Sequence, residues 1–479
     1  MRSPSRPSHP RSALTATCAL AAAIALSWPA TGAHAATTPA ATPTRLVPTR
    51  LVVRFKHHVS ATAQAATLRA AGVARSGDRV GGADVVTPRA GASPAAALRR
   101  LTARPQVAWA ERSLVAGAAY VPNDTGVVAA DGPLGGWEGL QWELDGPFGI
   151  NAPQAWSEAS KDGGSGGKGV TVAILDSGVA YADRGPYRRS PDLPASRFVR
   201  GYDFIDHDSY PNDEFGHGTL VASIVGAAAN NAYGTVGVAY RSTLMPVRVL
   251  DAQGRSDAAT IAKGLRWAVA HGADVVNMSL ELFDAPPLPP TPRSVMTSRT
   301  VRAALRVARS AGVVVVSATG NSFDLRVPGE SYDTLAINVG GTTEHGCLGN
   351  YSNHGPGMDI VAPGGGPDAA LPGDPNCHPS APMGRDISGV SFASNAPATF
   401  EILPGFRGTS SAAPHVTGVV ALMLASHVLG AHPTPRAVEQ QLERTARDLG
   451  KPGHDRYYGH GLLDAAAALK PPAAVTPSG

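Results

Sequence analysis

The chain has 479 residues, of which 43% are apolar and 16% are charged. This composition is typical of a globular protein and excludes a mainly disordered chain. The net charge of +4 is unevenly spread: residues 1–117 hold 15 basic and 3 acidic side chains, whereas residues 118–479 hold 26 basic and 34 acidic ones. Because phosphate binding requires a basic surface on the working domain, the acidic remainder argues against nucleic-acid binding.

The N-terminus has the pattern of a secretory signal peptide. Three arginines within the first 11 residues precede the uncharged apolar run Ala13–Leu26, and Ala33-His34-Ala35 forms a cleavage motif. We therefore predict that residues 1–35 are a signal peptide and that the protein is secreted and extracellular. The apolar run is too short to span a bilayer, so we expect no membrane association after its removal.

A small basic unit follows. Residues 36–48 are rich in Thr, Pro and Ala and predict a disordered linker. Residues 49–117 predict a small α/β domain, with strands at 51–55, 83–88 and 107–111 and helices at 61–71 and 94–102. A basic unit in front of an acidic one suggests an intramolecular partner. The alternative is an ordinary accessory domain.

From residue 150 to 468, apolar strand patterns alternate with helical ones. The strands are predicted at 170–175, 243–250, 275–278, 313–317, 334–339 and 358–361. The helices are predicted at 217–228, 257–271, 298–310 and 411–429. Nearly continuous apolar strands between helices predict an α/β fold with a mostly parallel sheet covered on both faces. Residues 471–479 predict a disordered tail.

Two cysteines remain once Cys18 leaves with the signal peptide. They are Cys347 and Cys377, in a Gly- and Pro-rich region. Because a secreted chain meets an oxidising environment, a disulfide is favoured over two free thiols.

Four polar residues stand at strand ends or helix starts, where catalytic groups gather in open α/β sheets. Asp176 follows a buried strand, His217 lies between two glycines, Asn321 follows Gly320 at a strand end, and Ser410 begins an apolar helix. Each has an ordinary alternative as a helix cap or turn residue. Together they offer a hydroxyl nucleophile, a base, an anion to orient the base, and an amide donor for an oxyanion.

The segments around these residues resemble the signatures of the subtilisin-like serine proteases. They are Asp176-Ser177-Gly178, Gly216-His217-Gly218-Thr219, Gly320-Asn321 and Gly408-Thr409-Ser410. The resemblance extends from about residue 122 to 468 and implies a subtilisin-like catalytic domain at 118–470. It also implies that residues 49–117 are a ferredoxin-like pro-domain that inhibits the enzyme intramolecularly. The protein would then be a monomeric, self-processed serine endopeptidase acting on proteins or peptides.

The resemblance assigns a role to each residue. Ser410 resembles the nucleophile, His217 its base and Asp176 the anion that orients the base. Asn321, with the backbone N–H of Ser410, resembles the oxyanion hole. The segment Ser279-Leu280 resembles the edge that binds an extended substrate, and Gly320 belongs to the other wall of the first specificity pocket.

One departure from the family pattern concerns this pocket. After Ser279-Leu280 the family often has two glycines, whereas this chain has Glu281 and Leu282. These side chains either narrow the cleft or add an acidic contact to it.

Calcium is the cofactor that the resemblance implies. The segment 230–237, with Asn231, resembles the calcium loop of the family; Asp192 matches its acidic ligand, and Asp124 offers another oxygen. A further group of acidic residues predicts either a second, weaker calcium site or, as the favoured alternative, a solvated acidic loop. These residues are Asp203, Asp206, Asp208 and Asp213.

Two other functions compete with an active protease. The first is a catalytically silent subtilisin-like binding protein, which the presence of all four catalytic residue types disfavours. The second is an esterase, but the segment around Ser410 lacks the G-x-S-x-G elbow, and the order Asp–His–Ser differs from that of the α/β-hydrolases.

Overall fold

The computed structural model describes residues 50–113, 115–118, 137, 140–161, 165–229, 234–283, 298–325, 335–392 and 396–472. The predicted signal peptide at 1–35, the predicted linker at 36–48 and most of the predicted tail at 471–479 lie outside these residues. So do two of the predicted calcium ligands, Asp124 and Asn231.

The N-terminal unit is a four-stranded sheet with two helices. The strands have the order β2-β3-β1-β4, and β1 lies antiparallel between β3 and β4. Their bounds are β1 Leu51–Phe55, β2 Val73–Val80, β3 Ala83–Pro88 and β4 Val107–Arg112, and the helices are α1 Ala61–Ala71 and α2 Pro94–Thr102. The predicted strands and helices of this unit are confirmed, whereas β2 was missed.

The two faces of this small sheet pack against different partners. Leu51 and Val53 point to one face and share a core with Leu68 of α1 and Leu101 of α2. Val52, which points to the other face, belongs to a core cluster that also contains residues of the large sheet's helices. The unit is therefore packed against the rest of the described chain.

The large sheet has seven strands in the order β14-β13-β12-β10-β6-β8-β7, and every neighbouring pair is parallel. The bounds are β6 Thr171–Asp176, β7 Tyr202–Asp203, β8 Thr243–Arg248, β10 Val275–Met278, β12 Val314–Ala318, β13 Ile337–Thr342 and β14 Ile360–Pro363. The predicted parallel sheet is confirmed, with strand ends displaced by up to three residues.

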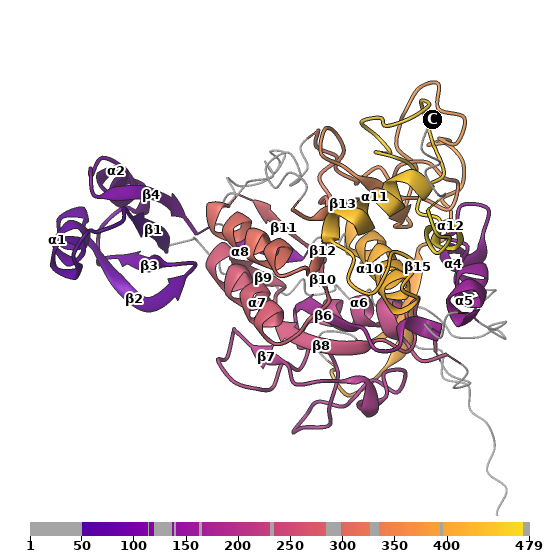
Figure 1. Ribbon diagram of the computed structural model, residues 1–479, viewed down its shortest axis with the longest axis horizontal. Coiled ribbons are helices and arrows are strands. Elements are labelled where there is room, and N and C mark those ends of the chain that lie inside the picture. Colours follow the sequence, from indigo (N-terminus) through magenta and orange to yellow (C-terminus); the bar gives the residue numbers. More distant parts are fainter. Residues whose placement is uncertain are drawn as a thin grey trace, which may run out of the picture. The chain divides into compact units, whose positions relative to one another are not determined.

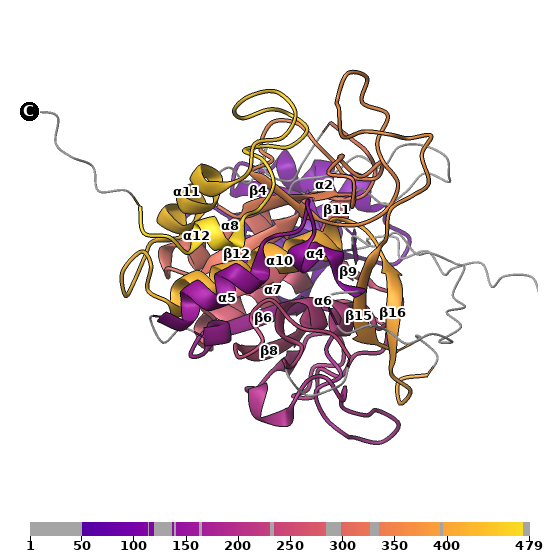
Figure 2. The same ribbon diagram turned by 90° about the vertical axis from the view of Figure 1, so that its right-hand side faces the viewer.

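Helices cover both faces of this sheet (Figures 1 and 2). Along β6, Val172 and Ile174 join the core on the side of α5, α6 and α10, whereas Ala173 and Leu175 join the core on the side of α7 and α8. The helices are α4 Trp142–Asp145, α5 Ala152–Lys161, α6 His217–Gly226, α7 Ala258–Ala270, α8 Arg299–Ser310, α10 Thr409–Ala425, α11 Pro435–Thr445 and α12 Ala465–Ala468, with short 3-10 turns at Ser165–Gly167 and Ala195–Arg197.

Two small antiparallel sheets complete the described fold. β15, Ile387–Ser391, pairs with β16, Glu401–Phe406. In the other sheet, β5, Val115–Ala118, lies between β11, Leu280–Phe283, and β9, Arg255–Asp257. The segment at the end of the N-terminal unit is therefore bound as a strand by two edges of the larger domain.

The predicted disulfide is present between Cys347 and Cys377, whose Cα atoms lie 4.8 Å apart. The alternative of two free thiols is wrong. Among the described residues, no helix has the length and apolar character needed to cross a membrane.

Candidate active site

Asp176 and His217 form a buried pair at the carboxyl end of the large sheet. Asp176 is the last residue of β6 and His217 the first of α6, and both side chains are almost fully buried. The distance from His217 Nδ1 to Asp176 Oδ1 is 2.8 Å. Because the carboxylate accepts, Nδ1 carries the proton, and Nε2 is the ring nitrogen that can take a proton from a hydroxyl.

The glycines around these residues allow two backbones to meet. A Cβ on Gly218 would lie 2.1 Å from the carbonyl oxygen of Gly178, and Gly178 itself has a φ of +102°. The space beside Gly218 is therefore filled by the segment that follows Asp176 and is not open to a substrate.

Asp213 holds the turn that carries His217. Its Oδ1 accepts the N–H of Gly216 at 2.9 Å, and its Oδ2 accepts the N–H and hydroxyl of Thr219 at 2.8 and 2.6 Å. Its Oδ1 also accepts the hydroxyl of Ser177, beside Asp176, at 2.9 Å. Burial raises the pKa of Asp213. This positioning role of Asp213 was not predicted from the sequence, although an aspartate shortly before a helix is a recognisable capping signal.

Ser410 lies in the first turn of α10 and is fully buried. Its hydroxyl donates to the carbonyl oxygen of Ser279 at 3.4 Å, and the Ser279 hydroxyl donates to the carbonyl oxygen of Ser410 at 2.9 Å. The His217 ring makes an edge contact with Phe406, with 5.5 Å between centroids. Since Phe406 directly precedes the turn into α10, this contact brings the imidazole to the end of the helix where Ser410 lies.

A second buried histidine, His415, is not a candidate base. Its Nδ1 donates to the carbonyl oxygen of Ser411 at 2.7 Å inside α10. Burial lowers the pKa of His415 to about 4, so its ring is neutral at physiological pH.

Asn321 has a defined amide orientation. Its Oδ1 accepts the backbone N–H of Thr409 at 2.8 Å and the Thr409 hydroxyl at 3.1 Å. The amide oxygen is thereby held on the residue before Ser410, and Nδ2 is the side of the amide that donates. An amide donor next to a hydroxyl at a helix N-terminus suits the stabilisation of an oxyanion.

Comparison with known proteins identifies the family of this chain. The Subtilase family matches residues 167–461. This chain belongs to the subtilase family. It is 33% identical over 324 residues to Subtilisin BL of Lederbergia lenta, which covers 68% of this chain and 98% of that protein. This subtilase is also 29% identical over 422 residues to the Thermophilic serine proteinase of Bacillus sp. (strain AK1), covering 88% of this chain and 86% of the relative.

A solved structure shows the same fold. The structure of fervidolysin from Fervidobacterium pennivorans, a keratinolytic enzyme related to subtilisin, aligns with 90% of this chain and 62% of its own. The TM-score is 0.64 and the sequence identity 22%. The subtilisin-like fold and the serine endopeptidase class predicted from the sequence are confirmed.

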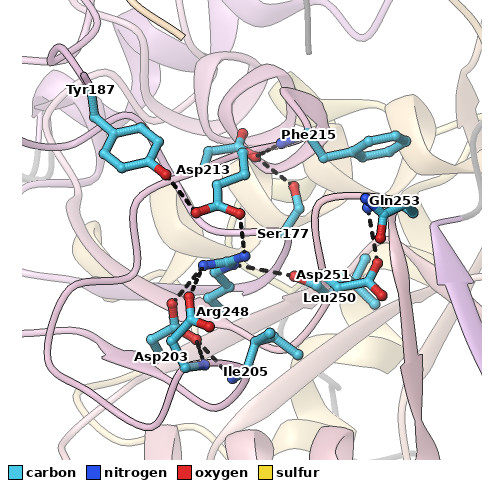
Figure 3. Close-up of polar contacts among 12 residues, drawn as sticks. Ser177, Tyr187, Asp203, Ile205, Asp213, Phe215, Arg248, Leu250, Asp251 and Gln253 are labelled. Atoms are coloured by element: carbon cyan, nitrogen blue, oxygen red, sulfur yellow. Dashed lines mark hydrogen bonds and ion pairs between the residues drawn. The ribbon is translucent and has the colours of Figure 1, made fainter. Parts of the chain in front are cut away.

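The acidic residues near Asp203 surround an arginine and not a cation site (Figure 3). Arg248 is buried at the end of β8 and contacts Asp203, Asp206 and Glu214 at 2.8–2.9 Å. Asp203 is itself buried, and Asp213 belongs to the His217 turn. The prediction of a second calcium site is therefore wrong here. The favoured alternative, a solvated acidic loop, is also wrong for Asp203 and Asp213, because both residues are buried.

Of the predicted calcium ligands, only Asp192 lies in the described residues. It is fully buried, and its Oδ2 accepts the N–H of Thr235 at 2.8 Å. The Oε1 of Gln141, also buried, accepts the N–H of Val236 at 2.8 Å. Two buried side chains that carry oxygens thus converge on the end of the predicted loop, and carboxylate and amide oxygens are ligand types that Ca²⁺ takes.

Another acidic cluster has a different explanation. Asp359, Glu439 and Glu443 bring carboxylate oxygens within 4.8 Å of one another. Arg436 lies 2.6 Å from Glu439 and 3.3 Å from Glu443, so an arginine already supplies positive charge there.

Proposed function

We propose that this subtilase is a secreted endopeptidase that cleaves peptide bonds through Asp176, His217 and Ser410. The observation that carries the proposal is the 2.8 Å contact between Asp176 and Nδ1 of a buried histidine beside the helix that begins with Ser410. This contact leaves Nε2 of His217 as the base.

The reaction follows from these positions. The Ser410 hydroxyl attacks the scissile carbonyl while its proton passes to His217 Nε2. Asn321 Nδ2 and the backbone N–H of Ser410 stabilise the oxyanion. His217 then gives the proton to the leaving amine, which leaves an acyl-enzyme. Water, activated by the same imidazole, releases the acid and restores Ser410.

We further propose that residues 49–117 are the inhibitory pro-domain of a self-processed proenzyme. β5 lies at the end of this unit and pairs with β11 and β9, as an extended substrate pairs with a cleft. The similarity to the Thermophilic serine proteinase covers 422 residues, more than the predicted catalytic domain contains, so it extends into the N-terminal unit.

Calcium is the structural cofactor that we propose for this enzyme. Asp192 and Gln141, which contact the described end of the predicted loop, would contribute to holding it, since carboxylate and amide oxygens suit a hard cation. It would stabilise the fold and take no part in bond cleavage.

Labelling with a fluorophosphonate tests the catalytic assignment. The secreted wild type should label at Ser410, and Ser410→Ala should not. Ser411→Ala is a matched control, because Ser411 is an adjacent, equally buried serine whose hydroxyl donates to Gly408 at 2.8 Å. A wild type that fails to label would favour the catalytically silent alternative.

A further inference from the structure

Glu281 lies on the wall of the cleft that faces the oxyanion-hole residue. It follows Leu280 in β11, and its side chain alternates with those of Leu280 and Leu282. The two leucines are buried in the core shared with α7 and α8. Glu281 therefore points to the opposite face, the same one as Ser279, whose hydroxyl contacts Ser410.

The Glu281 carboxylate reaches the other wall. Its Oε2 accepts the backbone N–H of Asn321 at 2.9 Å, and a Cβ on Gly320 would lie 2.6 Å from the same oxygen. Glu281 as a whole residue is 5% exposed. The Glu281 side chain thus spans the space between β11 and the Gly320–Asn321 turn. The family resemblance implies that these two segments are the walls of the first specificity pocket.

The register of β5 indicates which substrate residue meets Glu281. Ala118 pairs with Leu280, and Gly117 pairs with Glu281. A substrate strand in the same register has its next residue opposite Ser279, whose carbonyl oxygen lies 3.4 Å from Ser410 Oγ. The side chain of that residue, the one before the scissile bond, points into the space that Glu281 crosses.

We propose that Glu281 fills the far part of this pocket and restricts the enzyme to substrates with a small residue, such as alanine or glycine, before the scissile bond. The proposal rests on the proposed function, because it concerns the same cleft. A mismatch of one methylene group in a pocket already changes kcat/KM by roughly 10–200-fold. In this chain, the residue that follows Ala118 is itself an alanine.

The test compares peptide substrates that differ only in having alanine, phenylalanine or arginine before the scissile bond. Fluorophosphonate labelling first counts the active sites, so a failed proposed function shows as absent labelling and not as altered preference. Wild type should favour alanine over phenylalanine by at least about tenfold in kcat/KM per labelled site. Glu281→Gly should raise the phenylalanine-to-alanine ratio by about tenfold or more.

Glu281→Gln separates size from charge and keeps the test decisive if the glycine variant fails to fold. It preserves the length of the side chain, so the preference for alanine over phenylalanine should remain. A wild type that favours arginine, with this preference lost in Glu281→Gln, would overturn the proposal in favour of charge recognition. A wild type that cleaves after phenylalanine as well as after alanine, or an unchanged ratio in Glu281→Gly, would also overturn it.

Discussion

Removing the Glu111 carboxylate should weaken the binding of the proposed pro-domain to the rest of the enzyme. It lies in β4, and its carboxylate sits at the N-terminus of α8, where backbone N–H groups lack partners inside the helix. Oε2 accepts the N–H of Arg299 at 2.9 Å, and Oε1 accepts the N–H and hydroxyl of Thr300 at 3.0 and 2.6 Å. The Ser298 hydroxyl also donates to Oε1, at 3.2 Å.

The size of the effect follows from these contacts. A hydrogen bond to a charged group contributes about 1.5–3 kcal/mol, and the helix dipole adds roughly 0.3–1 kcal/mol. The contacts are not additive, and water replaces them once the unit dissociates. We therefore expect Glu111→Ala to cost about 2–4 kcal/mol of binding, which is roughly 30–700-fold in affinity.

Dilution of the self-cleaved complex measures this affinity. If this unit is the inhibitory pro-domain, the cleaved unit should inhibit until dilution dissociates it, so recovered activity against concentration gives the midpoint of dissociation. Glu111→Ala should raise the midpoint by the factor above, and Glu111→Gln, which keeps one acceptor oxygen, should raise it less. Arg69→Ala, an exposed change in α1, is the control and should behave as wild type. A midpoint that moves less than about threefold in Glu111→Ala would refute the reasoning.

Three further results are expected. Ser410→Ala should accumulate as a proform that starts near Ala36, whereas the wild type should start between Ala116 and Asp124, as N-terminal sequencing would show; equal maturation of both would exclude self-processing. EDTA should lower the melting temperature, and Asp192→Asn should reduce this effect, since an ion bound only by the folded state stabilises it; an unchanged melting temperature would exclude a calcium site. Burial raises the pKa of Glu143 from its ordinary value of 4.5 to about 8. Between these pH values the unfolded chain has lost this proton while the folded chain retains it, so the free energy of unfolding falls as the pH rises. In a Ser410→Ala background, Glu143→Gln should therefore gain up to about 4 kcal/mol of stability at pH 8 and little at pH 4.5, in denaturant titrations; an equal gain at both pH values would contradict the assignment.

The sequence was most informative where local pattern decides structure. The apolar runs at 275–278 and 313–317 correspond to β10 and β12, because strands buried on both faces read as continuous apolar stretches. The helix at 61–71 was predicted with its observed ends, which Ser60 and Gly72 cap. Local rules also predict the order and chemical types of the residues proposed to be catalytic.

The sequence was less informative where partners distant in the chain decide structure. β2 contains the polar stretch Arg75-Ser76-Gly77-Asp78 and becomes a strand by pairing with β3. β5 has no alternating pattern and depends on β9 and β11 for its hydrogen bonds. Likewise, the acidic residues near Asp203 resembled a cation site because the sequence does not reveal that Arg248 neutralises them from another strand.

Gly178 and Gly218 let two segments that are distant in the sequence pack closely enough for Asp176 to contact His217. Asp176 ends a strand and His217 begins a helix, and neither element alone fixes the distance between their side chains. The missing Cβ atoms of Gly178 and Gly218 let these segments touch, since a Cβ on Gly218 would also lie 3.1 Å from the Cβ of Asp176. Asp213 then ties both segments together through Ser177 and Thr219. The 2.8 Å contact between Asp176 and His217 is therefore set by backbone packing and a buried carboxyl group outside the triad. For this reason, the contact between Asp176 and His217 depends on Gly178 and Gly218 as well as on the two side chains that make it.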